Sequence, residues 1–112
     1  MKNEFVFEEF VKGNRGLKTN HIFIEGNVLY SYGYHFPLAI RLLLGDSFKF
    51  ILNSDKYSRT TSKQKTQLLY YINKDDILKE YDTSKMQIIA DSKVTSVKEF
   101  MANNLQDEAI TI

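Results

Sequence analysis

The stretch HIFIEGNVLYSY, residues 21–32, decides the fold that this chain is expected to adopt. Its two halves, residues 21–25 and 28–32, are runs of β-branched and aromatic side chains, which favour strands. They are separated by Gly26-Asn27, and glycine at the first turn position suits a type II′ turn, whose twist matches that of the flanking strands. The stretch therefore predicts an antiparallel β-hairpin.

Two further apolar runs extend this hairpin into a larger sheet. Residues 36–42 predict a third strand, and Pro37 is tolerated because it stands near the start of that strand. Gly45-Asp46 can turn the chain again, and residues 47–52 begin with the alternating pattern of a fourth strand. Residues 21–52 thus predict a four-stranded antiparallel β-meander, whose contacts are local and form readily.

Helices are expected before and after this sheet. Residues 4–12 gather apolar side chains on one helical face and end at Gly13, a typical helix stop, with a strand as the alternative for this segment. After the sheet, Thr61 and Gln64 fit a capping box, in which the side chain of each residue satisfies a free N–H of the other. We therefore expect a helix that has Thr61 as its N-cap.

The remaining part of the chain predicts shorter elements. Residues 75–81 fit a second short helix or turn, with acidic residues well placed at its start. Residues 86–90 predict a short strand. Ser96 and Glu99 form a second capping box, which predicts a C-terminal helix over about residues 97–104.

Together these patterns predict one α+β domain, in which a four-stranded antiparallel β-meander packs against two to four short helices. The 112 residues match the size of a single domain. The expected parts are an N-terminal helix and loop (1–20), the β-meander (21–52), helices (61–81), a short strand and C-terminal helix (86–105) and a tail (106–112). The tail is expected to be loose, with an edge strand over residues 109–112 as the alternative.

Composition and charge exclude several classes of site. The chain has no cysteine, which excludes disulfides, thiolate metal sites and thiol nucleophiles. The longest apolar run, residues 36–44, is interrupted by Arg41 and is too short to cross a bilayer. The acidic pair Glu8-Glu9 stands where a signal peptide would be apolar. We therefore expect a cytoplasmic protein without a membrane partner, in the host cytoplasm if the protein is viral.

The motifs predict no catalytic, cofactor or metal site. His21 and His35 lie on different predicted strands and have no carboxylate at the spacing of a metal ligand. The sequence contains neither the G-x-S-x-G nucleophile motif nor a glycine-rich phosphate loop. The acidic pairs Glu8-Glu9 and Asp75-Asp76 fit solvated helix faces. These observations predict a protein that is not an enzyme.

One segment, Lys56 to Lys65, combines hydroxyl and basic side chains at the predicted start of a helix. Free N–H groups and the helix dipole favour an anion there, and the basic side chains and Tyr57 would suit a phosphate backbone with its bases. The alternative, favoured because capping motifs are common, is that the hydroxyls only cap the helix and the cations face solvent. The candidate binding surface consists of Lys56, Tyr57, Arg59, Thr60, Lys63, Lys65, Tyr32 and Tyr34.

Four aromatic residues recur with a period of two along the chain: Tyr30, Tyr32, Tyr34 and Phe36. On a strand this period places them on one face. A covered face would make them core, which is favoured because a small domain needs large apolar side chains inside. An open face would offer stacking or protein contacts, which Tyr57 and Tyr70-Tyr71 would widen.

Four short motifs carry a family resemblance: Ser31-Tyr32-Gly33-Tyr34, Pro37-Leu38-Ala39-Ile40, Asn53 to Ser58, and Thr60-Thr61-Ser62-Lys63. In this order they resemble a small domain of unknown function that occurs in proteins of phages, plasmids and archaea. The match covers Val28 to about Leu69 and departs at Gln64, where the family pattern often has histidine, so a role for that histidine does not carry over. The resemblance implies a sheet followed by a helix and a mobile-element or viral origin, and it implies no activity.

These expectations favour a protein that acts by binding. The first hypothesis is a small phage- or mobile-element-type accessory protein that inhibits a host protein, for example a CRISPR or other defence effector. The second is a nucleic-acid-binding module that uses residues 56–65. The third is a small-ligand binder or an enzyme without a recognisable motif. A host or phage protein is thus the expected partner, nucleic acid is the alternative, and a homodimer is compatible with all three hypotheses.

Overall fold

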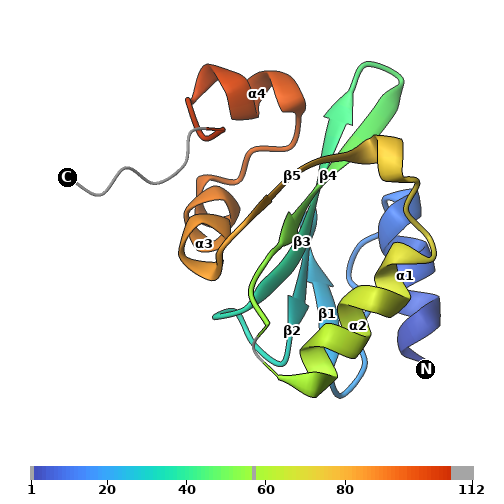
Figure 1. Ribbon diagram of the computed structural model, residues 1–112. Helices are drawn as coiled ribbons and strands as arrows, with labels where there is room; N and C mark the ends of the chain where they lie inside the picture. Colours follow the sequence, from blue (N-terminus) through green and yellow to red (C-terminus); the bar gives the residue numbers. More distant parts are fainter. Residues whose placement is uncertain (1, 57, 107–112) are drawn as a thin grey trace.

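A five-stranded sheet lies between two layers of helices (Figure 1). The computed structural model describes residues 2–56 and 58–106. In this part of the chain the fold is α+β, with a mixed sheet of five strands and four α-helices. The expected fold class is therefore confirmed, whereas the sheet has one strand more than the predicted meander.

The first four strands form the predicted antiparallel meander. They are β1 (Ile22–Glu25), β2 (Val28–Ser31), β3 (Pro37–Leu44) and β4 (Ser47–Asn53). In the turn between β1 and β2, Gly26 has a φ of 60°, which glycine adopts without strain and which a type II′ turn needs at this position. Pro37 is the first residue of β3, the position at which a strand inside a sheet tolerates proline.

A fifth strand, β5 (Ile77–Tyr81), lies parallel to β4 and completes the order β1-β2-β3-β4-β5. The prediction of a helix or turn over residues 75–81 is therefore wrong for this strand. Helical structure in this region is limited to a short 3₁₀-helix, η1 (Lys74–Asp76). Lys49 of β4 anchors η1, because its Nζ donates to the carbonyl of Asp75 at 2.9 Å. A run of five residues is too short for its period to separate a strand from a helical turn.

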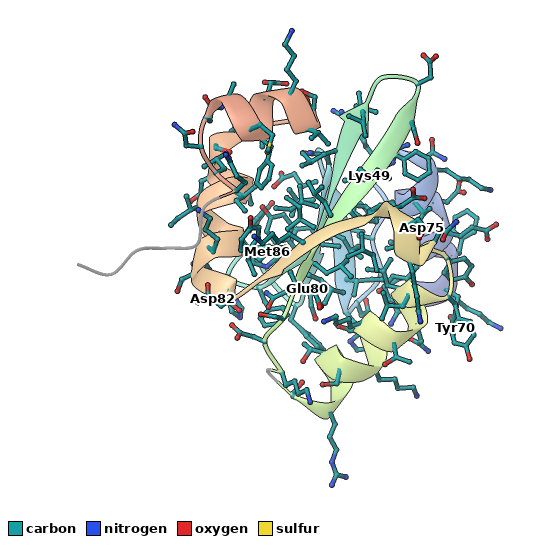
Figure 2. The ribbon with its side chains drawn as sticks, turned by 45° about the horizontal axis from the view of Figure 1, so that its top comes forward. Lys49, Tyr70, Asp75, Glu80, Asp82 and Met86 are labelled. Carbon is teal, nitrogen blue, oxygen red and sulfur yellow. The ribbon has the colours of Figure 1, made fainter. Side chains whose placement is uncertain are left out.

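Residues 86–90 form part of a helix, which corrects the prediction of a strand there. The helix is α3 (Thr83–Ser92), and its N-cap Asp82 accepts the N–H of Lys85 at 2.9 Å. Met86 and Ile89 are three residues apart and are both buried against the sheet, and Figure 2 shows Met86 directed from α3 toward it. A short apolar run fits either period, and here the cap and the position of β5 decide in favour of the helix.

Helices cover both faces of the sheet (Figure 1). On one face lie α1 (Asn3–Lys12) and α2 (Arg59–Leu69), and on the other lie α3 and α4 (Val97–Ala102). Two of these helices confirm the sequence prediction, since α1 ends at Gly13 with a φ of 94° and α4 begins at the N-cap Ser96. The predicted tail, apart from its first residue, falls on residues 107–112, which lie outside the described residues.

Each face of the sheet has its own apolar core. Phe7 and Phe10 of α1 and Leu68 of α2 are fully buried on one side, and Phe100 of α4 is buried on the other. All four residues of β2 are buried, because both of its faces are covered. Each fully buried large apolar side chain stabilises the fold by about 1.5–3 kcal/mol relative to its exposed state.

The helix α2 begins one turn earlier than predicted. Its N-cap is Ser58, and Thr61 occupies the third helical position. The Oγ of Ser58 accepts the N–H of Thr61 at 3.2 Å, and Oγ1 of Thr61 accepts the N–H of Ser58 at 2.8 Å. Gln64, which was expected to complete the capping box, is buried instead. Serine and threonine are both favoured at the N-cap, so a run of hydroxyl residues leaves the position of the cap open.

The substitution Ser58→Ala tests where α2 starts. We expect it to lower the free energy of unfolding by about 1 kcal/mol, the usual loss when alanine replaces a serine cap. Equilibrium urea denaturation followed by circular dichroism measures this loss. Ser62→Ala is the matched control, because Ser62 lies inside the helix, and it should change stability by no more than about 0.5 kcal/mol. Equal losses in the two variants would contradict the assigned cap.

Candidate functional site

Two adjoining cavities form a cleft at the N-terminal end of α2, which we call the α2 cleft. Their volumes are about 500 and 380 Å³, and they share the lining residues His35 and Phe36. The remaining lining residues come from three separate segments of the chain: Ser31, Tyr32, Asp55, Lys56, Ser58, Thr61 and Thr83. The cleft therefore lies where β2 ends, β3 begins and the chain passes from β4 into α2.

The buried side chain of Asn53, the last residue of β4, fixes the walls of the α2 cleft. Its Nδ2 donates to the carbonyl of Pro37 at 2.8 Å and to Oγ1 of Thr83 at 3.2 Å. Its Oδ1 accepts the N–H of Asp55 at 2.8 Å. One amide thus joins the start of β3, the start of α3 and the segment that leads into α2. An unsatisfied buried amide costs about 1–3 kcal/mol, so these bonds hold the three segments in one arrangement.

Asp55 is a fixed negative charge at the edge of the cleft. Its Oδ2 accepts the N–H of Thr83 at 2.8 Å. Hydrogen bonds from the hydroxyl and the backbone N–H of Thr83 lower the pKa of Asp55 below its ordinary value, because they stabilise the charged carboxylate. Asp55 therefore secures the start of α3 and is not suited to exchange a proton near neutral pH.

Tyr32 extends into solvent beside the cleft from a strained backbone. Its φ is 64°, in the left-handed region that bulky residues rarely adopt. Its N–H donates to the carbonyl of His21 at 2.7 Å, and the centres of the two rings lie 5.4 Å apart. The side chain is nevertheless 52% exposed, so burial does not offset the strain. A strained backbone of this kind lowers the stability of the fold by about 1–3 kcal/mol, and such residues occur most often at functional sites.

Gln64 of α2 lies beneath the cleft and is 2% exposed. Its Oε1 accepts the hydroxyl of Ser31, a residue that lines the cleft. Its Nε2 has no acceptor among the described residues. The bond to Ser31 joins β2 to α2, so the cleft has a polar floor within an otherwise apolar layer of the protein.

The structure brings part of the predicted binding surface together. Tyr32 and Lys56 line the α2 cleft, although 24 sequence positions separate them (56 − 32). Arg59, Thr60 and Lys63 do not line the cleft but are exposed on the first turns of α2, a helix whose N-cap Ser58 does line it. These five residues come from two segments that the sequence pattern had singled out separately.

Three members of the predicted surface do not belong to this group. Lys65 forms an ion pair with Glu80 of β5 at 2.5 Å. Tyr34 lines a different cavity, and its hydroxyl donates to Glu25 of β1 at 3.2 Å. Tyr57 lies outside the described residues. The structure therefore places Tyr34 and Lys65 apart from the start of α2, and the contact surface itself stays a prediction.

The predicted row of four aromatic residues does not share a face. The strand β2 ends at Ser31, so the period of two stops there. Tyr30 is buried under the α3 and α4 layer, whereas Phe36 is buried under α1 and α2. Tyr32 and Tyr34 are exposed. The interpretation as core thus holds for two of the four residues, on opposite faces of the sheet.

Sequence reasoning did not identify the residues that position the cleft. Asn53, Ser31 and Thr83 are ordinary polar residues that stand at element ends, and no local pattern marks their mutual contacts. Two of them, Asn53 and Ser31, stand within the motifs of the family resemblance, which was the available signal.

Two classes of site can be checked directly on the structure. Among residues 2–56 and 58–106, no group of three histidine, cysteine, aspartate or glutamate side chains is arranged to hold a metal ion. Within the same ranges, none of the helices combines the length and the apolar character that crossing a bilayer demands. Comparisons with protein-family models, with curated proteins and with solved structures find no match for this chain.

The pKa of Asp55 provides a test of how Thr83 holds the cleft together. In Thr83→Val we expect this pKa to rise toward the ordinary value of 3.8, because the hydroxyl that stabilises the carboxylate is lost. An NMR titration of the carboxyl carbon measures the change. In the wild type the pKa is lower in the folded state than in the unfolded state. The stability that Asp55 contributes is therefore present above pH 3.8 and is lost as the pH falls through the folded pKa.

Thr66→Val serves as the control for this titration. It removes an exposed hydroxyl of α2 that bonds to the carbonyl of Ser62 and does not contact Asp55. We expect it to leave the titration of Asp55 unchanged. An unaltered Asp55 pKa in Thr83→Val would show that the threonine hydroxyl does not stabilise the carboxylate, because the backbone N–H at this position remains in the variant.

Proposed function

We propose that the protein acts by binding, without catalysis, and that the α2 cleft and its rim contact single-stranded nucleic acid. The observation that carries this proposal is a group of cations without acidic partners beside an exposed aromatic ring. Lys56, Arg59 and Lys63 form no ion pair with any described residue. They lie around the first turns of α2, and Tyr32 lies at the same cleft.

The start of α2 adds to the attraction for phosphate. Ser58 and Thr61 satisfy each other's N–H groups, and Arg59 and Thr60 occupy the first helical positions, where N–H groups have no acceptor within the helix. The positive end of the helix dipole lies at the same place. Basic side chains are unfavourable at this end of an isolated helix, and a bound phosphate backbone would compensate them.

Tyr32 offers a surface on which a base can stack. Stacking on an aromatic side chain contributes about 1–3 kcal/mol per base and does not depend on the identity of the base. This free energy is comparable with the cost of the strained Tyr32 backbone. A base stacked on the exposed ring would therefore offset that backbone strain. The expected binding is therefore tolerant of sequence and sensitive to salt.

The contacts within the cleft also support a role without catalysis. The hydroxyls of Ser58 and Thr61 are engaged in the helix cap, and the carboxylate of Asp55 is engaged by Thr83. A nucleophilic mechanism needs a hydroxyl or similar group that is paired with a base and free to react. The polar groups of the α2 cleft instead support its shape.

Charge removal at the rim tests the proposal. We expect a labelled single-stranded oligonucleotide to bind at low salt, as measured by fluorescence anisotropy. Arg59→Gln and Lys63→Gln should weaken binding by comparable factors, and each should reduce the slope of log K against log salt by about 0.7, the contribution of one phosphate contact in a single strand. Tyr32→Ala should weaken binding roughly tenfold, because one stacked base is lost.

Lys98→Gln is the matched control for these variants. Lys98 is an exposed cation of α4, on the other face of the sheet, and it forms no ion pair with the described residues. Its removal should leave affinity and salt slope unchanged. The absence of binding at low salt, or an equal loss in Lys98→Gln and Arg59→Gln, would refute a nucleic-acid interface at the α2 cleft.

A separate apolar patch at the end of α2 favours a protein partner as a second candidate. Leu69, Tyr70 and Tyr71 are all exposed, and Tyr70 is 85% exposed. Figure 2 shows Tyr70 at the outer side of the helix layer, directed away from the sheet. Contiguous exposed apolar side chains mark interaction sites, and tyrosine is enriched at their energetic centres. The resemblance to a mobile-element domain supports a host or phage protein, such as a defence effector, as this partner.

Tyr70→Ser tests this patch. We expect it to reduce capture of the partner from a host lysate without changing the melting temperature, because Tyr70 makes little contact within the fold. Ile88→Ser removes an exposed apolar side chain from α3 and is the control. Light scattering distinguishes self-association, since a dimer that Tyr70→Ser converts to a monomer assigns the patch to a second copy. Capture and oligomeric state that are the same in Tyr70→Ser as in the wild type would exclude the patch.

A further inference from the structure

Two arginines meet at the end of β2 that is opposite to the α2 cleft. Arg15, from the segment after α1, and Arg41, from β3, line one cavity of about 30 Å³ beside Gly26. The turn at Gly26 precedes β2, whereas the α2 cleft begins where β2 ends, so the two places are separated by the length of this strand. The cavity has room for more than one water-sized group.

Arg41 is held in a fixed position. Its Nε donates to the carbonyl of Val11 at 3.0 Å, and its guanidinium carbon lies 4.4 Å from the centre of the Phe48 ring. Gly13 passes so close that a Cβ at this residue would lie 2.9 Å from Nη1 of Arg41. A planar guanidinium that is already immobilised loses little entropy when it binds an anion.

Neither guanidinium has an acidic partner in the part of the chain that the structure describes. The ion pairs found there use other cations, and the Nη groups of Arg41 have no protein acceptor within residues 2–56 and 58–106. Burial and then the charge of Arg15 lower the pKa of Arg41 below its ordinary value. Two like charges are thus brought together without compensation, an arrangement that costs stability until an anion joins it.

A larger cavity of about 580 Å³ adjoins the pair and shares Arg15 with it. Its lining includes a third cation, Lys18, and the rings of Phe23 and Tyr34. Its volume lies within the range of small-molecule sites. The acidic residue of this cavity, Glu25, accepts a hydrogen bond from the hydroxyl of Tyr34 at 3.2 Å. Glu25 is therefore placed to accept a hydroxyl or amine of a ligand in the larger cavity.

We propose that Arg15 and Arg41 bind the phosphate group of a small molecule whose body lies in the larger cavity. Guanidinium groups match the oxygens of a phosphate in paired hydrogen bonds, which are stronger than bonds between neutral groups. Lys18 adds a third positive charge to the lining of the larger cavity. The rings of Phe23 and Tyr34 suit an aromatic body for the ligand.

A purely structural role for Arg41 leaves part of this arrangement unexplained. The bond from its Nε to Val11 stabilises the C-terminal end of α1, where a positive charge is favourable. That role uses one of the five donors of the guanidinium. The nearby charge of Arg15 destabilises the charged form of Arg41. If Arg41 served α1 alone, removing Arg15 would not alter any response to phosphate.

Titration of the full chain with phenyl phosphate at constant ionic strength, followed by NMR, tests the proposal. We expect saturable shifts of the backbone amides of Gly13, Gly26 and Arg41. Arg15→Gln should weaken binding about tenfold, the usual effect of one lost hydrogen bond to a charged group. Inorganic phosphate should shift the same amides with lower affinity, because it leaves the larger cavity unused.

Two further measurements make the outcome decisive. Without ligand at low salt, Arg15→Gln should raise the melting temperature by about 1–4 °C, because it removes the repulsion with Arg41. This readout does not depend on whether a variant of Arg41 folds. Lys98→Gln should bind phenyl phosphate as the wild type does. The absence of saturable shifts, or equal losses in Arg15→Gln and Lys98→Gln, would overturn the site and would leave the α2 cleft unaffected.

Discussion

The buried amide of Asn53 is the contact on which the arrangement of the other elements depends. It joins the end of β4 to Pro37, Thr83 and Asp55, and the first two of these lie 16 and 30 residues away in the sequence. Polar groups inside a core are almost always hydrogen-bonded, so the bonds of this amide allow the segments one relative position. They fix the direction in which the chain leaves β4. The start of α2 and the return of the chain to β5 follow from that direction.

The parallel pairing of β4 and β5 explains the layered form of the protein. A parallel connection needs a crossover on one face of the sheet, and α2 provides it beside α1. The chain then continues to α3 and α4 on the opposite face, which leaves β2 buried on both sides. Strands that are covered on both faces carry continuous apolar runs, whereas alternating strands have one wet face. The aromatic row that begins at Tyr30 divides between the two cores because β2 ends at Ser31, so the period of two does not continue to Phe36.

The two proposed sites lie at opposite ends of β2. Each contains a local arrangement that lowers the stability of the fold. Tyr32 holds a strained backbone while its ring remains in solvent, and Arg41 holds its charge close to that of Arg15. Such local conflicts are expected at functional positions. The exposed cations at the start of α2 suit a polymer that approaches with many charges, whereas the immobilised guanidinium of Arg41 suits one small anion.

The elements whose signals are local can be predicted from the residues alone. The hairpin around Gly26, the strands that follow it, and the helices α1 and α4 were predictable because turn residues, caps and periods lie within a few positions of one another. The sequence also marked Arg59 and Lys63 as cations near a helix start. That residues 77–81 form a strand and residues 86–90 a helix follows from packing in the folded chain, because short apolar runs fit both periods until β4 offers an edge to pair with. Tertiary packing alone brought Arg15 beside Arg41, since the end of α1 meets β3 only in the folded chain.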